Sequence, residues 1–263
     1  ASNNTAVGFL SMQLNTTATG NAAFGYATLD ANTTGASNTA IGFNNMSANT
    51  TGYNNSALGY YALTLNTTGH SNVAVGLNAL QANTTGVSNT ALGVSALSAN
   101  TTAAGNTAVG LNALLANTTG ASNVAVGVFA LDANTTGAEN TAIGYASMST
   151  NTTASNNTAL GISSLALNTT GAGNTALGRL SLYNNTTAGD NTAVGNSCLQ
   201  NNTTGASNIG VGTGALFSNT EGAGNVAIGH NTLDANTTAS NITAVGYAAL
   251  SANTTGASNT AVG

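Results

Sequence analysis

The sequence is nearly devoid of charge. It has one basic residue, Arg179, six acidic residues, and only 3% charged residues in all. Ordinary soluble domains carry about 25% charged residues, so little electrostatic repulsion keeps copies of this chain apart and we expect self-association. One cation cannot neutralise a phosphate backbone, which excludes nucleic acid as a partner.

The chain also lacks proline and tryptophan and has a single cysteine, Cys198. Disulfides therefore do not hold the fold together. We interpret Cys198 as a small buried apolar residue, with an intermolecular disulfide as the alternative. No apolar run approaches the 18 residues of a membrane-spanning helix, and no signal peptide opens the chain, so we expect no membrane insertion in this segment.

What the sequence does contain is one 17-residue unit, written repeatedly without insertion or deletion. Residues 106–122, Asn-Thr-Ala-Val-Gly-Leu-Asn-Ala-Leu-Leu-Ala-Asn-Thr-Thr-Gly-Ala-Ser, represent it, and they define positions 1 to 17 below. Position 5 is glycine in every unit, from Gly8 to Gly263. Such a period predicts a solenoid. We expect residues 1–263 to form a single repeat array of 15 full 17-residue coils plus eight residues, a window of a longer fibre.

Positions 2 to 5 predict a strand with two unlike faces. Bulky residues occupy positions 2 and 4, and Ala and Gly occupy positions 3 and 5. Positions 4, 9 and 11 are the predicted interior. For positions 7 to 11 we favour a second strand over a short helical turn. The predicted fold class is all-β, a parallel β-solenoid (β-roll) of about 15 coils.

Stacking is required because a lone coil cannot fold. Burying a Val and a Leu stabilises a coil by roughly 3–6 kcal/mol, whereas ordering its backbone costs about 17–34 kcal/mol. The absence of drift at positions 3 and 5 indicates that this face packs closely, against either the opposite wall of the coil or another chain. The representative residues of this packing face are Ala40, Gly42, Ala108, Gly110, Ala142 and Gly144.

Position 12 is asparagine in every complete unit, and threonine always follows it. Stacked asparagines can form a hydrogen-bonded ladder, as in cross-β structures. The same Asn-Thr-Thr segment is an N-glycosylation sequon. Both interpretations stay open, and a glycan on the neighbouring threonine is a third. The candidates are Asn15, Asn32, Asn49, Asn66, Asn83, Asn100, Asn117, Asn134, Asn151, Asn168, Asn185, Asn202, Asn236 and Asn253.

The ionisable residues do not predict an enzyme. His70 and His230 are more than nine coils apart, too far to share a metal. Asp30, Asp132 and Asp234 all fall at position 10, each six coils from the next, so they cannot form a carboxylate pair. We expect no catalytic residues, no cofactor and no metal.

An apolar residue precedes glycine in all sixteen units, as in Val7-Gly8, Ile41-Gly42 and Val109-Gly110. Asn-Thr-Ala commonly precedes this pair, and Ala-Leu commonly follows it two residues later. The pattern resembles the head repeats of YadA-like trimeric autotransporter adhesins, and it is similar to repeats of phage-tail-like fibres. The resemblance implies a left-handed parallel β-roll, three chains side by side, and display on a bacterial surface.

We therefore expect an extracellular structural fibre or filament subunit at the cell surface, whose partner is itself, as a trimer or filament. One alternative is a surface adhesin that binds a glycan or receptor through the aromatic residues at variable positions. The other is an ice-binding protein that uses the threonine rows at positions 13 and 14. The aromatic candidates are Tyr26, Phe43, Tyr60, Tyr61, Phe129, Tyr145 and Tyr247.

Overall fold

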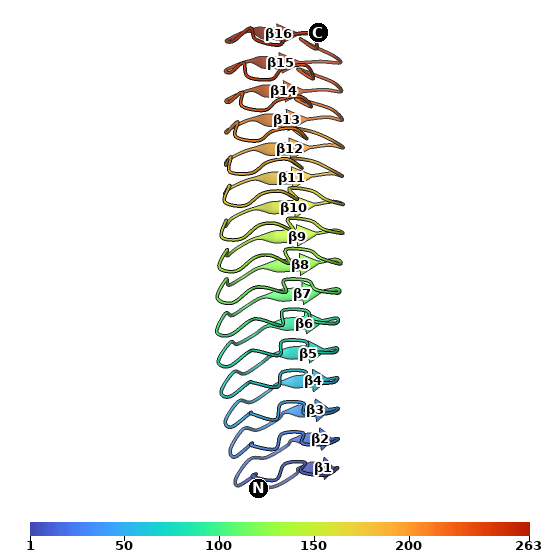
Figure 1. The fold of residues 1–263 in the computed structure, drawn as a ribbon, viewed down its shortest axis with the longest axis vertical. Helices are drawn as coiled ribbons and strands as arrows, with labels where there is room; N and C mark the ends of the chain where they lie inside the picture. The colour runs from blue at the N-terminus through green and yellow to red at the C-terminus, as the bar shows by residue number, and fades with distance from the viewer. The chain divides into compact units, whose positions relative to one another are not determined.

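The computed structural model describes all 263 residues and contains strands and turns but no helix (Figure 1). Each strand has three residues and occupies positions 2 to 4 of its unit. The chain is a parallel β-solenoid with one turn per 17 residues, so the predicted fold class is confirmed. The strands are β1 Thr5–Val7, β2 Ala22–Phe24, β3 Thr39–Ile41, β4 Ser56–Leu58, β5 Val73–Val75, β6 Thr90–Leu92, β7 Thr107–Val109, β8 Val124–Val126, β9 Thr141–Ile143, β10 Thr158–Leu160, β11 Thr175–Leu177, β12 Thr192–Val194, β13 Ile209–Val211, β14 Val226–Ile228, β15 Thr243–Val245 and β16 Thr260–Val262.

The coils group into two compact units. The N-terminal unit comprises Ala1–Phe129 with Ala133–Thr136 and holds β1 to β8. The C-terminal unit comprises Ala130–Asp132 with Gly137–Gly263 and holds β9 to β16. Within each unit, successive strands pair in parallel with like positions opposite one another. A slip of one residue would turn every inward side chain outward, so the alternation of small and bulky residues fixes this register.

The strands turn their small residues inward. Position 3 is fully buried, as at Ala108, whereas positions 2 and 4 lie on the outer surface. The prediction that position 4 belongs to the interior is therefore wrong. Position 11 is also wrong, because Leu65 is exposed there. Position 9 is confirmed, since Leu114 and its equivalents are fully buried from Leu29 to Leu233.

The narrowness of the coil explains why alanine, and not a bulkier residue, faces inward. At Gly210, the one position 3 without a methyl group, an added Cβ would lie 3.4 Å from Cδ1 of Leu199. The leucine row at position 9 thus reaches the inner face of the strands and leaves space for a methyl group only. The bulky residue at position 4 has no room inside and turns outward.

Glycine at position 5 is required by backbone geometry. At Gly110 the φ angle is +133°, and an added Cβ would lie 2.6 Å from the carbonyl oxygen of Gly127 in the next coil. No side chain fits at that distance. Ala40, Ala108 and Ala142 are likewise fully buried within the chain. The partner of the predicted packing face is therefore the chain's own backbone and opposite wall.

Positions 6 to 11 form neither the favoured strand nor a helical turn, so the prediction of a second strand is wrong. Positions 7 and 9 adopt left-handed φ angles, for example 55° at Asn112 and 54° at Leu114. Each such residue costs roughly 1–2 kcal/mol in isolation. Hydrogen bonds between coils offset this cost: the N–H of Asn112 donates to the carbonyl of Val94 at 3.0 Å, and that of Leu97 to Ala113 at 2.9 Å.

Candidate functional site

The asparagines at position 12 form the predicted ladder inside each unit. Nδ2 of Asn83 donates to Oδ1 of Asn66 at 2.8 Å, and Nδ2 of Asn100 donates to Oδ1 of Asn83 at 2.9 Å. Each Nδ2 also donates to the carbonyl three residues on, as Asn83 does to Gly86 at 3.0 Å. The ladder joins Asn15, Asn32, Asn49, Asn66, Asn83, Asn100, Asn117 and Asn134 in the N-terminal unit, and Asn151, Asn168, Asn185, Asn202, Asn219, Asn236 and Asn253 in the C-terminal unit.

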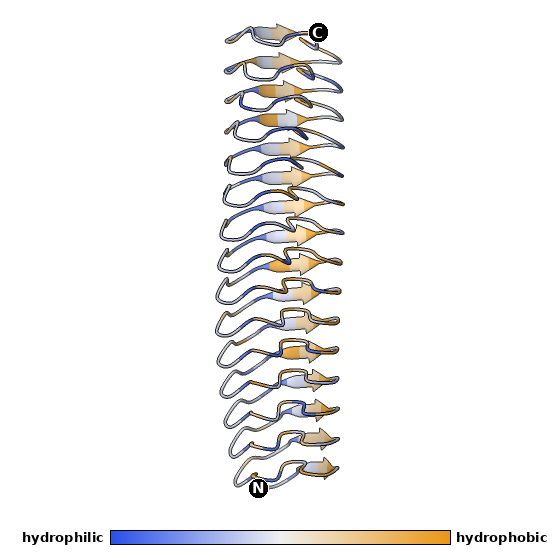
Figure 2. Cartoon of the chain, viewed as in Figure 1, coloured by the Kyte–Doolittle hydropathy of each residue, from blue (hydrophilic) through white to orange (hydrophobic).

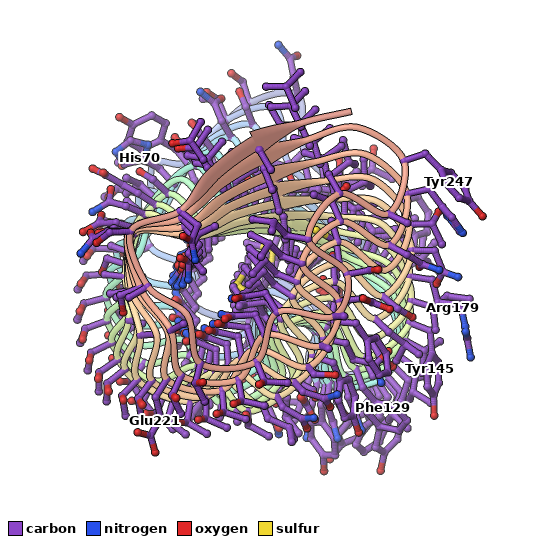
Figure 3. All side chains as sticks on the ribbon, turned by 90° about the horizontal axis from the view of Figure 1, so that it is seen from above. His70, Phe129, Tyr145, Arg179, Glu221 and Tyr247 are labelled. Atoms are coloured by element: carbon purple, nitrogen blue, oxygen red, sulfur yellow. The ribbon has the colours of Figure 1, made fainter.

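A second asparagine row, at position 1, completes the polar part of the interior. The N–H of Asn106 donates to Oδ1 of Asn89 at 3.0 Å, and Nδ2 of Asn89 reaches across its coil to the carbonyl of Ala103 at 2.8 Å. The same carbonyl accepts from Asn100 at 3.2 Å. The two rows therefore meet at position 15. Figure 3 shows nitrogen atoms gathered on one side of the interior. The near invariance of asparagine at position 1, with Ile242 as the one exception, is the signal for this row in the sequence.

Burial of position 12 favours the ladder over N-glycosylation of the same asparagines. The asparagine side chain is fully buried in the stacked coils, as at Asn83, and its Nδ2 already donates two hydrogen bonds. N-glycosylation modifies this nitrogen atom, so a folded coil cannot carry a glycan there. The adjacent Thr84 donates its hydroxyl to the carbonyl of Thr101 at 3.0 Å. Thr85, at position 14, points to solvent.

The two histidines lie in different units, and each stacks on a tyrosine. The ring centroids of His70 and Tyr53 are 4.5 Å apart, and those of His230 and Tyr247 are 5.4 Å apart. The structure contains no group of three His, Cys, Asp or Glu side chains spaced for a metal ion. Asp30 buries its Oδ1 without a hydrogen-bond partner. The structure thus brings none of the predicted ionisable residues together.

Cys198 is fully buried at position 8, in agreement with its interpretation as a small buried apolar residue. Burial raises the pKa of its thiol to about 12. An added Cβ at Gly210, in the next coil, would lie 2.5 Å from its Sγ. In this coil, the Sγ atom of Cys198 thus occupies the space that a methyl group at position 3 of the next coil would fill.

The most prominent surface feature is an outer apolar face, which we define as the side chains at positions 4 and 6. Figure 2 shows the hydrophobic colour following the strands coil after coil. In the N-terminal unit every one of these side chains is apolar or aromatic. Exposed patches of this extent usually mark interaction sites. The exposed members in this unit are Val7, Phe9, Phe24, Tyr26, Ile41, Leu58, Tyr60, Leu77, Leu92, Val94 and Leu111.

Four aromatic rings at position 6 stack on one another at the N-terminal end of this face. The centroid distances are 5.6 Å from Phe9 to Tyr26, 4.9 Å from Tyr26 to Phe43, and 5.0 Å from Phe43 to Tyr60. Tyr61 packs its edge against Tyr60 at 4.4 Å, and its interaction with Tyr60 raises the pKa of the latter. The inner rings of the row are covered on both faces by their neighbours, so they present edges to solvent.

In the C-terminal unit the same row is interrupted. Position 6 begins with Tyr145 and Ile162 and then carries four consecutive polar residues before Tyr247. Figure 3 shows Tyr145, Arg179 and Tyr247 pointing outward. The outer apolar face is thus unbroken in the N-terminal unit only. The four interrupting residues are Arg179, Asn196, Thr213 and His230, and all are exposed.

Comparison with known proteins does not identify a function for this surface. No family model matches the chain, and no curated protein is significantly similar to it. A helix with the length and hydropathy needed to cross a membrane is not found in the structure.

Proposed function

We propose that this chain is a structural subunit of an extracellular fibre or filament at the cell surface, which acts through its repetitive coils and associates with copies of itself. The observation that carries the proposal is the ladder. Backbone, asparagine and threonine hydrogen bonds repeat from coil to coil, for example at Asn83, Thr84 and Leu97. Such an interior resembles that of cross-β assemblies, in which regular stacking provides the stability.

Three further observations support self-association and display. The chain has few charges to keep copies apart. Its outer apolar face is exposed along the N-terminal unit. Its repeat resembles that of adhesin heads, which are displayed on bacterial surfaces. The proposal assigns the chain no catalytic activity, cofactor, nucleic acid or membrane-inserted part.

Light scattering across a dilution series, with electron microscopy of the same samples, tests this proposal. We expect oligomers or filaments at micromolar concentration. A monodisperse monomer throughout the series, with no fibres on the grid, contradicts it. Antibody labelling of intact cells that produce the full-length protein tests the location, and surface labelling is expected.

A surface adhesin is the second candidate, because Tyr26 and Tyr60 expose ring edges in a regular row. The stacking of the row weakens this candidate, since sugars bind best to open ring faces. A glycan array without hits removes it.

Ice binding is the third candidate. The exposed threonines at position 14 form a row interrupted only by Glu221, while the hydroxyls at position 13 are engaged in the ladder. Absence of thermal hysteresis in a concentrated solution removes this candidate.

A further inference from the structure

The geometry points to one part of the surface as the site of self-association: the outer apolar face of the N-terminal unit binds the same face of a second copy. This inference rests on the proposed function and adds to it the surface and the partner. The C-terminal unit, with its polar interruption at position 6, lies outside the contact.

The exposed area of this face is sufficient for a stable contact. It has eleven exposed apolar side chains in the N-terminal unit, the largest fraction being 68% at Phe9. Together these side chains expose several hundred Å², on the scale of the roughly 800 Å² per partner of a standard protein interface. Positions 4 and 6 in the C-terminal unit offer fewer such side chains, and these are separated by polar ones.

The repeat itself favours a second copy as the occupant. The side chains at positions 4 and 6 recur with every coil, and the rings from Phe9 to Tyr60 follow one another at 4.9–5.6 Å. A partner whose side chains fill the spaces between successive coils, over the eight coils of this unit, needs side-chain rows with the same spacing. A copy of this chain has them, and as this face of the N-terminal unit carries no charged side chain, two such faces meet without electrostatic repulsion.

Position 6 of the C-terminal unit is unsuited to the same contact. Burying Arg179 against an apolar row would remove a guanidinium group from water without a partner, which is strongly unfavourable. Asn196 and Thr213 would likewise lose hydrogen bonds to water. An apolar row therefore binds the apolar unit in preference to the polar one.

Single arginine substitutions at position 6 of the full chain test the inference. Phe43→Arg and Leu77→Arg place a charge in the N-terminal row, and Leu77 lies outside the aromatic stack. Ile162→Arg and Thr213→Arg are the matched controls in the C-terminal row. Arg179 shows that position 6 accommodates an arginine side chain at the surface. Circular dichroism confirms the fold of each variant, and sedimentation velocity across a dilution series measures association.

We expect the two N-terminal variants to weaken association on the order of tenfold or more, with the controls close to the wild type. Equal weakening by all four variants would overturn the localisation and leave self-association standing. Association unchanged in all four would also overturn the inference, because copies would then meet elsewhere. A wild-type chain that stays monomeric removes the proposed function itself and this inference with it.

Discussion

The two units have almost the same interior and different exteriors. Both contain the asparagine ladders, the inward alanines, the position 5 glycines and the buried leucine row. Outside, position 6 is always apolar or aromatic in the N-terminal unit, whereas four of its seven residues in the C-terminal unit are polar. The interior therefore determines the coil, which each unit builds in the same way. Packing inside the coil does not constrain the outer positions, so most of the sequence differences between the two units lie there.

The alanine row at position 3 and the asparagine row at position 1 have one exception each, and both exceptions lie in the C-terminal unit. Gly210 replaces alanine where Cys198 needs space. Ile242 replaces asparagine at position 1, and its N–H still donates to Oδ1 of Asn225 at 3.0 Å. The next asparagine of the row, Asn259, is exposed and can bond to water. An exception in the interior is tolerated where a neighbouring side chain fills the space of the missing methyl group, or where water replaces the missing hydrogen bond.

The largest effect is expected from breaking the position 12 ladder. Asn83→Leu in the N-terminal unit removes the acceptor of Asn100 and the donor to Asn66. Asn185→Leu in the C-terminal unit removes the equivalent hydrogen bonds of Asn202 and Asn168. Each leaves one buried N–H and one buried amide oxygen of the ladder without a hydrogen bond, so we expect a loss of about 2–6 kcal/mol in the free energy of unfolding.

Urea denaturation measures these losses, and hydrogen exchange by mass spectrometry assigns each loss to one unit. Because the two interiors are the same, the losses should agree to within about 0.5 kcal/mol. A loss confined to one of the two variants would contradict the equivalence of the interiors.

The next effect concerns the compensated pair of the C-terminal unit. Gly210→Ala places a methyl group 2.5 Å from Sγ of Cys198, and such overpacking costs about 1–3 kcal/mol. Cys198→Ala combined with Gly210→Ala recreates the arrangement of Ala113 and Ala125, which the N-terminal unit contains. The double variant should recover most of the lost stability. A thermodynamic cycle of the four proteins that shows no coupling would rule out the steric explanation of Gly210.

Cys198 should also make the stability of the C-terminal unit depend on alkaline pH. Its pKa is about 12 in the folded chain, against 9.0 for an unperturbed thiol. The folded state therefore retains the proton to a higher pH than the unfolded state. Stability is unaffected below pH 9 and falls between pH 9 and 12, by roughly 1.4 kcal/mol at pH 10.

Urea denaturation at pH 8 and pH 10 measures this loss, and Cys198→Ala is the control. The two proteins differ at this residue alone, so the comparison isolates the thiol. An equal dependence on pH in both proteins would show that the thiol is not responsible.

The repeat allowed the solenoid to be predicted, and the position 12 ladder as one interpretation of the asparagine row, because both follow from residues that recur every 17 positions. The direction of the strand faces was not predictable in the same way. Val109 is more hydrophobic than Ala108, yet the alanine is buried. The space available beside the position 9 leucines decides this, and a pattern of hydrophobicity alone does not contain it.

The turn at positions 6 to 11 was unpredictable for a different reason. Leucine rarely adopts a left-handed φ angle, so Leu97 at φ 53° carries no local signal for that conformation. The N–H of Leu97 donates to the carbonyl of Ala113 in the next coil, a hydrogen bond that only stacking supplies. The contrast between the two outer surfaces is visible in the sequence, as the change from apolar to polar residues at position 6. Its meaning depends on the structure, because only the structure places position 4 beside position 6 on the outside.

The smallest effects are expected at the adjacent threonines of positions 13 and 14, which look alike in the sequence. Thr84→Ala removes a hydroxyl that donates to Thr101 at 3.0 Å, and it should cost about 0.5–1.5 kcal/mol. Thr85→Ala alters an exposed side chain and should change stability by less than about 0.5 kcal/mol.

The C-terminal unit already contains the natural version of this test. Glu221 stands at position 14 there, and Thr220 beside it still donates to Thr237 at 3.1 Å. Glu221→Thr should therefore leave stability unchanged. If urea denaturation gave equal losses for Thr84→Ala and Thr85→Ala, position 14 would have a structural role, and the recurrence of threonine there would no longer favour a function at the surface.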